Sequence, residues 1–154
     1  WSSGVALDND GNVYMTGGDL NSLYTWVTKF APNGNIIWQR QLDRYSSGEA
    51  IVFANNYLYI MMSDLDDIPL SGNILVAKMS TSGSLVSLWS FDDNSGDIPQ
   101  GFSITVDELD NVYYTGIQNN SSNLFDIIVG KLNTNTSYLD WKILIARSNL
   151  ITIS

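Results

Sequence analysis

Short runs of apolar, β-branched and aromatic residues alternate with polar turn signals along the chain. The signals Asp-Gly-Asn at 10–12 and Pro-Asn-Gly at 32–34 each lie between two such runs. Apolar runs on both sides of a Gly-containing turn are typical of β-hairpins, and continuous helical periodicity is absent from the sequence. The pattern therefore predicts an all-β chain built from hairpins.

Two hairpin segments recur three times. The first is VALDNDGNVY (5–14), which aligns without gaps to AIVFANNYLY (50–59) and ITVDELDNVY (104–113). The second follows each copy of the first, at 26–38, 75–89 and 128–141. A period of roughly 50 residues is the length of one four-stranded repeat in several β-rich arrays. The chain is thus expected to hold three tandem copies of one unit.

The rarer residue types coincide between the copies. Three of the five tryptophans close the second segment of their copy. One lysine and one tyrosine recur in the same way. The repeat positions are Tyr14, Tyr59 and Tyr113; Lys29, Lys78 and Lys131; and Trp38, Trp89 and Trp141.

Two hairpins in each copy give four strands, and tandem four-stranded antiparallel units are typical of β-propeller blades. We expect one propeller fragment over 1–154, with blades at 1–42, 46–91 and 98–145 and the start of a further blade at 148–154. A closed propeller has about four to eight blades. Three blades are therefore a partial propeller or part of a larger ring, completed by further blades of the same chain or by another copy.

The copies also resemble a known family. The stretch GVALDNDGNVYMTG (4–17), followed by WVTKFAPNGNIIW, closely resembles the SBBP-type repeat of bacterial propellers, and DNVYYTG (110–116) matches it as well. The middle copy departs from the pattern, because Phe53 replaces the Asp, Asn56 replaces the Gly and Met62-Ser63 replaces Thr-Gly. The resemblance implies a propeller in a secreted or surface-exposed bacterial protein. It implies no common activity.

Residue size predicts where the strands lie within a blade. Small residues flank the first strand of each copy, which suits a crowded axis and places that strand innermost. The tryptophan-bearing fourth strand is then outermost, where large aromatic rings fill the space between neighbouring sheets. The repeat lysines lie in the third strand, where the apolar stem can pack between sheets while the ammonium reaches an acid or a carbonyl. We therefore interpret both residue types as structural.

The charge of the chain bears on its partners. Sixteen acidic against seven basic residues give a net charge of −9, which repels nucleic-acid phosphates and anionic membranes. No apolar run approaches the roughly 20 residues that cross a bilayer. Acidic residues gather in the longer connections, which alternating strands bring to one face. The candidate binding residues on this acidic long-loop face are Asp64, Asp66, Asp67, Asp92, Asp93 and Asp97.

Composition narrows the chemistry that this chain can supply. It contains no histidine and no cysteine, which excludes a Ser-His-Asp triad and His or thiolate metal ligands from these residues. A glycosidase needs only two carboxylates, and the two glutamates are Glu49 and Glu108. We nevertheless expect no catalysis within the fragment.

Calcium is the remaining cofactor to consider. Asp8-Asn9-Asp10-Gly11-Asn12 places oxygen ligands at alternate positions, as calcium loops do. However, an EF-hand-like loop has its glycine sixth and a distal acid, whereas Gly11 is fourth here. A plain hairpin turn is the better interpretation, and we expect no cofactor, with calcium at the clustered carboxylates left as an alternative.

These observations favour a non-enzymatic recognition or scaffolding module of an extracellular or cell-surface bacterial protein. It would bind a protein or a glycan through the acidic long-loop face, with rigid blades holding loops at fixed spacing. One alternative is a carbohydrate-active enzyme whose carboxylate site is completed by other blades. Another is a structural repeat of a surface filament or a phage particle.

Overall fold

The chain folds into antiparallel β-sheets. The computed structural model describes residues 1–18, 24–64, 74–91, 99–119, 125–136 and 138–145 of the 154, and every element in these ranges is a strand. The strands are β1 (Ser2–Leu7), β2 (Val13–Gly18), β3 (Tyr24–Phe30), β4 (Ile36–Ala54), β5 (Tyr57–Asp64), β6 (Ile74–Ser80), β7 (Leu85–Phe91), β8 (Pro99–Val106), β9 (Val112–Asn119), β10 (Phe125–Asn133) and β11 (Tyr138–Ile145). The all-β prediction is confirmed, and no helix that could span a membrane occurs among these residues.

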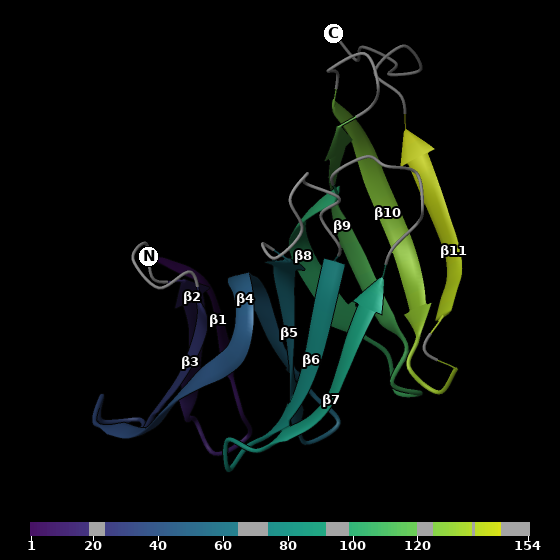
Figure 1. Ribbon diagram of the computed structural model, residues 1–154. Helices are drawn as coiled ribbons and strands as arrows, with labels where there is room; N and C mark the ends of the chain where they lie inside the picture. The colour runs from purple at the N-terminus through teal and green to yellow at the C-terminus, as the bar shows by residue number, and fades with distance from the viewer. Residues whose placement is uncertain (19–23, 65–73, 92–98, 120–124, 137, 146–154) are drawn as a thin grey trace, which may run out of the picture.

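The strands form three four-stranded meanders, each paired in chain order (Figure 1). Sheet 1 consists of β1, β2, β3 and the first half of β4. Sheet 2 consists of the second half of β4 with β5, β6 and β7, and sheet 3 consists of β8 to β11. The 19-residue strand β4 belongs to both of the first two sheets, since Tyr45 pairs with Tyr24 and the next residue, Ser46, pairs with Asp64. The chain thus passes from sheet 1 to sheet 2 in extended conformation.

Two β-bulges occur at equivalent places in all three sheets. The first strand of each sheet carries one extra residue, which is Ser3, Glu49 or Phe102. The fourth strand carries another beside the repeat lysine of the neighbouring strand, and this residue is Ile37, Val86 or Asp140. Because a bulge bends and twists its strand, the shared bulges show that the copies repeat in backbone geometry as well as in residue type.

The pairing corrects the alignment of the middle copy. Phe53 lies opposite Leu58, as Leu7 lies opposite Val13, so Phe53 corresponds to Leu7 and does not replace the Asp. The gapless alignment was wrong here because the middle hairpin is one residue shorter. Its turn consists of Asn55 and Asn56, both with positive φ (50° and 66°), as a two-residue type I′ turn requires.

The tryptophan positions also differ in the middle copy. Trp38 lies opposite Lys29 and Trp141 opposite Lys131, whereas Ser87 takes this place opposite Lys78. Trp89 lies two residues further along β7, opposite Val76. Because strand residues alternate between faces with period two, Trp89 keeps the same face as Lys78.

The sheets stack face to face through two shared cores. We call the face of each sheet that carries its repeat tyrosine and lysine the head face, and the opposite face the tail face. The head face of sheet 1 packs on the tail face of sheet 2, around Tyr14, Val27, Ile51, Leu58 and Ile60. The head face of sheet 2 packs likewise on the tail face of sheet 3, around Tyr59, Met61, Val76, Ile104 and Tyr114.

The middle sheet is therefore covered on both faces. Along β5, Leu58 and Ile60 face sheet 1 while Tyr59 and Met61 face sheet 3, and all four are fully buried. A strand buried on both faces has a continuous apolar sequence, which accounts for the run Tyr57–Met62.

Neighbouring sheets approach each other closely at their first strands. The second half of β4 lies against β1, and β8 lies against β4 and β5 (Figure 1). The Ser3 hydroxyl donates to the Gly48 carbonyl at 2.6 Å, and a Cβ added at Gly4 would lie 3.0 Å from the Ile51 nitrogen. Small residues in the first strand permit this approach. The predicted further strand at 148–154 lies outside the described residues.

Candidate functional site

The first hairpin turn of sheet 1 is organised by the carboxylate of Asp8. Its Oδ1 accepts hydrogen bonds from the backbone N–H groups of Asp10 (3.0 Å) and Asn12 (2.9 Å). Its Oδ2 accepts from the Asn12 amide and from the Tyr14 hydroxyl, both at 2.8 Å. Burial opposes ionisation of Asp8, but these hydrogen bonds outweigh it and lower the pKa of its carboxyl to about 2.

Sheet 3 repeats this turn with Asp107. Its Oδ1 accepts from the N–H groups of Leu109 and Asn111, and its Oδ2 accepts from the Asn111 amide and the Tyr113 hydroxyl. The oxygens that a calcium ion would require at Asp8 are thus engaged in closing a hairpin. The hairpin interpretation of residues 8–12 is confirmed by this geometry.

The repeat lysine of sheet 1 reaches sheet 2. Its ammonium lies 3.7 Å from Asp8 Oδ2 and 5.1 Å from the centre of the Tyr14 ring. Lys29 Nζ also donates to the Thr81 carbonyl, in the β6–β7 turn, at 3.4 Å. Trp38 Nε1 donates to the same oxygen at 3.1 Å. Two side chains on the head face of sheet 1 therefore hold one turn of sheet 2.

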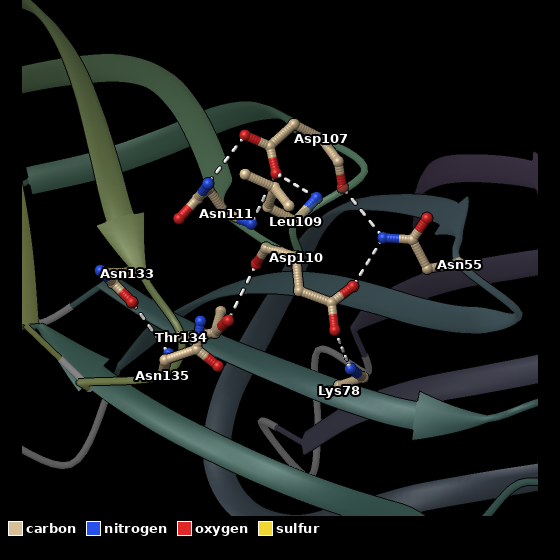
Figure 2. A network of polar contacts seen from close by, with 9 residues as sticks. All are labelled: Asn55, Lys78, Asp107, Leu109, Asp110, Asn111, Asn133, Thr134 and Asn135. Carbon is tan, nitrogen blue, oxygen red and sulfur yellow. Dashed lines mark hydrogen bonds and ion pairs between the residues drawn. The ribbon is translucent and has the colours of Figure 1, made fainter.

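The repeat lysine of sheet 2 reaches sheet 3 in turn (Figure 2). Lys78 Nζ lies 2.7 Å from Asp110 Oδ2, in the β8–β9 turn. Asn55 Nδ2 donates to Asp110 Oδ1 at 2.6 Å and to the Asp107 carbonyl at 2.9 Å. The Asp110 carbonyl accepts from the Thr134 hydroxyl at 2.9 Å, which joins the two turns of sheet 3. This network connects three turns across the boundary between two sheets.

The electrostatics of this network favour the charged pair. Burial opposes ionisation of Asp110, but hydrogen bonds from Lys78 and Asn55 outweigh it and lower the pKa of the carboxyl. Burial also opposes the charge of Lys78, yet the bond to Asp110 raises the pKa of its ammonium. Burial raises the pKa of the neighbouring Tyr59 hydroxyl to about 12. All three groups keep their ordinary charge at neutral pH.

The repeat lysine of sheet 3 makes its ion pair within its own sheet. Lys131 Nζ lies 3.0 Å from Asp140 Oδ2, the bulge residue of β11, and 5.8 Å from the centre of the Tyr113 ring. Trp141, opposite Lys131, is 40% exposed. No other described sheet covers this head face.

The predicted acidic face is described at one residue only. Asp64 ends β5 and is 5% exposed, so its carboxylate is not a solvent-facing ligand. Asp66, Asp67, Asp92, Asp93 and Asp97 lie outside the described residues, and their role in binding stays a prediction.

The two glutamates do not form a glycosidase pair. Glu49 is the bulge residue of β4, and burial raises the pKa of its carboxyl. Glu108 is exposed in the β8–β9 turn, which contacts Asn55, the residue that follows the end of β4. Six residues of strand separate Glu49 from Asn55, about 20 Å at about 3.3 Å per residue. The carboxyl groups of a glycosidase lie only about 5–9.5 Å apart.

Some site residues were missed by sequence reasoning. The Asp8–Asn12–Tyr14 arrangement has a signal, the spacing Asp-x-x-x-Asn-x-Tyr, which is present in the first and third copies and absent from the second. The acceptors at Thr81 and Asp110 have none, because they lie on a different sheet from the lysine that they bind.

Comparison with solved structures relates the chain to other β-rich proteins. A protein of unknown function from Bacteroides caccae superposes with a TM-score of 0.53 at 9% identity, over 92% of this chain and 60% of that one. A variant of Synechocystis apocarotenoid oxygenase gives 0.54 at 12% identity, over 90% and 36%. An ACO/RPE65 chimera gives 0.52 at 12% identity, over 86% and 34%.

At such identities the likeness concerns the fold alone, and this chain spans less than two thirds of each matched structure. No protein-family model and no curated protein sequence matches the chain.

Proposed function

We propose that this chain is a non-enzymatic recognition or scaffolding module whose sheets are consecutive blades of a β-propeller, as in the SBBP-type repeats that it resembles. The propeller arrangement is supported by three equivalent meanders that stack head to tail with their first strands adjacent. The likeness to larger β-rich structures is compatible with a segment of a longer array.

The main support for the proposal is that the repeated charged side chains make contacts between sheets. Lys29 and Lys78 each bind a turn of the following sheet, and Asp110 is the partner of one of them. The polar groups that stand out in the sequence therefore hold sheets in register. They give a rigid frame rather than a reaction centre.

This frame leaves one end of the sheets for recognition. The tight turns, including 8–12, 55–56, 81–84 and 107–111, lie together at one end (Figure 1). The strand ends Gly18, Asp64, Phe91 and Asn119, where the longer connections begin in the sequence, lie at the opposite end of the sheets. We propose that a protein or glycan at the bacterial cell surface binds there, with Asp66, Asp67, Asp92, Asp93 and Asp97 among the contacts.

The labelled chain can be tested on an array of polysaccharides and on intact bacterial cells. We expect retention that is lost when Asp66, Asp67, Asp92 and Asp93 are replaced by Asn together. Glu108→Gln, an exposed change in the tight turn 107–111, is the matched control and should bind like the wild type. Retention that survives the fourfold change would contradict this placement of the site.

One observation favours a second candidate, a carbohydrate-active enzyme completed by other blades. Glu49 lies half-buried in the first strand of sheet 2 with a raised pKa, as a general acid requires. The same polysaccharides should be assayed for released reducing ends with the wild type and Glu49→Gln. Release that Glu49→Gln abolishes would replace the recognition proposal by this one.

A further inference from the structure

The two outer sheets each leave one face without a neighbouring sheet in the described part of the chain. On sheet 3 this is the head face, which carries Tyr113, Thr115, Val129, Lys131 and Trp141. On sheet 1 it is the tail face, which carries Val5, Val13, Met15 and Phe30. Each has an equivalent inside the molecule that a neighbouring sheet covers.

The head face of sheet 3 is exposed where its equivalents are buried. Ile127 is 39% exposed, whereas Thr25 and Ile74, which precede their repeat lysine by the same interval, are 0% and 2% exposed. Thr115 is exposed, whereas its equivalents Thr16 and Met61 are fully buried. Among the described residues, no following sheet covers this face.

The tail face of sheet 1 is likewise exposed where its equivalents in the other sheets are buried. Val5 is 67% exposed, whereas its equivalents Ile51 and Ile104 are 7% and 8% exposed under the preceding sheet. Met15 is half-buried, while its equivalent Ile60 is fully buried. The apolar residues that a preceding sheet would cover are thus present on sheet 1.

Each open face is also hollowed at the place where a strand would pack. The hollow on sheet 3 is lined by Ser103, Thr105, Tyr113, Thr115 and Val129, among others. Ser103 is equivalent to Gly4, against which the backbone of Ala50 and Ile51 packs inside the molecule. The hollow on sheet 1 is lined by Val5, Val13, Met15 and Phe30 with Ser2, Ser3 and Gly4.

The polar contacts complete the match. Lys29 and Lys78 bind acceptors in the turns of the following sheet, whereas Lys131 binds Asp140 of its own sheet. In sheet 1 the residue equivalent to Thr81 is Pro32, which keeps a carbonyl oxygen. The nearby exposed Asp10 adds a carboxylate. A tail face of this chain therefore carries acceptors for the ammonium of Lys131.

We propose that the head face of sheet 3 docks on the tail face of sheet 1 of a second copy, in the way that consecutive sheets pack within the chain. The proposal rests on the stacking in the proposed function and names a partner for it. Because different surfaces of the two copies meet, the contact is heterologous and generates a closed ring or an open chain.

The test measures mass against concentration by analytical ultracentrifugation. Wild-type protein should rise above the 17.1 kDa of one chain as its concentration increases. Thr115→Arg on the head face and Val5→Arg on the tail face should each remain at the mass of one chain, because an arginine at either place is buried against an apolar surface. Leu109→Arg, in an exposed turn, is the control and should associate like the wild type.

Mixing the two blocked variants sharpens the test. The head face of Val5→Arg and the tail face of Thr115→Arg are both intact, so an equimolar mixture should form a dimer and nothing larger. Both changes are at exposed positions, and circular dichroism should show that each variant is folded. A mixture that stays at the mass of one chain would overturn the head-to-tail contact, as would a wild type that stays so at every concentration.

A crosslink tests the register independently. The chain has no cysteine, so a Ser103→Cys, Val5→Cys double variant can form a disulfide only through these two positions. Under oxidation we expect multimers on non-reducing gels, and neither single variant should give more than a dimer. Failure to crosslink would overturn the proposed register. Lys78→Met tests the stacking within the chain separately, through the stability of the folded protein. If Lys78→Met lowers this stability but the crosslink does not form, the contact between copies is wrong and the stacking within the chain stands.

Discussion

At the scale of single residues, the three repeat lysines occupy equivalent strand positions but differ in what their ammonium groups contact. Lys78 bridges two sheets through Asp110, whereas Lys131 pairs with Asp140 on an open face. The amphipathic stem of each can pack in the same way. The chain thus contains its own matched comparison of an ion pair between two sheets and an ion pair within one sheet.

Lys78→Met removes the ammonium and keeps the apolar stem. We expect a loss of about 1–3 kcal/mol in the free energy of unfolding, because Asp110 keeps a partly buried charge without its cation. Lys131→Met should cost less, because Lys131 pairs with Asp140 of its own sheet and holds no second sheet in place. Urea unfolding of dilute protein measures both, and equal losses would show that Lys78 does not hold sheet 3.

At the scale of elements, the turn at 55–56 combines a backbone requirement with a contact to the next sheet. Both asparagines have positive φ, but only the Asn55 amide binds Asp107 and Asp110. The backbone requirement can therefore be separated from the contact by changing one residue at a time.

Asn56→Gly should raise the thermal midpoint slightly, because glycine adopts positive φ without steric cost and Asn-Gly is the preferred type I′ pair. Asn55→Gly should lower it, because the turn keeps its geometry while two hydrogen bonds to sheet 3 are lost. Differential scanning calorimetry measures both. Shifts of the same sign would mean that Asn55 acts only through the backbone.

The strands could be predicted because certain residue types recur in the sequence. Turn signals predict the hairpins. The recurring tyrosines and lysines predict the repeat and the structural role of the lysines. The bulges at Ser3, Glu49 and Phe102 could not be predicted, since these three residues share no chemical property. The shortened middle hairpin was missed because a gapless alignment places Phe53 by count rather than by pairing.

The candidate site was less predictable for a related reason. A lysine that packs between sheets can be anticipated from its strand, but its acceptor is set by how two sheets stack. Thr81 contributes a backbone carbonyl, which any residue has. Asp110 lies in a turn whose equivalent in sheet 2 is two asparagines. Neither acceptor is distinguishable in the sequence.

At the scale of the whole molecule, each described sheet packs, within the described residues, only against its neighbours in the chain. In arrays of this kind stability is approximately a sum of unit terms and nearest-neighbour interfaces. Sheet 2 has two interfaces, and sheets 1 and 3 have one each within the described residues. The same substitution should therefore cost more in sheet 2, unless a second copy supplies the missing interface.

Ile60 and Met15 test this directly, since they are equivalent tail-face residues of sheets 2 and 1. In dilute solution Ile60→Ala should cost about 2–5 kcal/mol as a buried truncation, and Met15→Ala clearly less. When copies associate, the thermal midpoint rises with concentration by mass action. The penalty of Met15→Ala should then grow, because association covers its site. In the Thr115→Arg background, which blocks association, this penalty should not depend on concentration. A concentration dependence that persists in that background would place the contact between copies elsewhere.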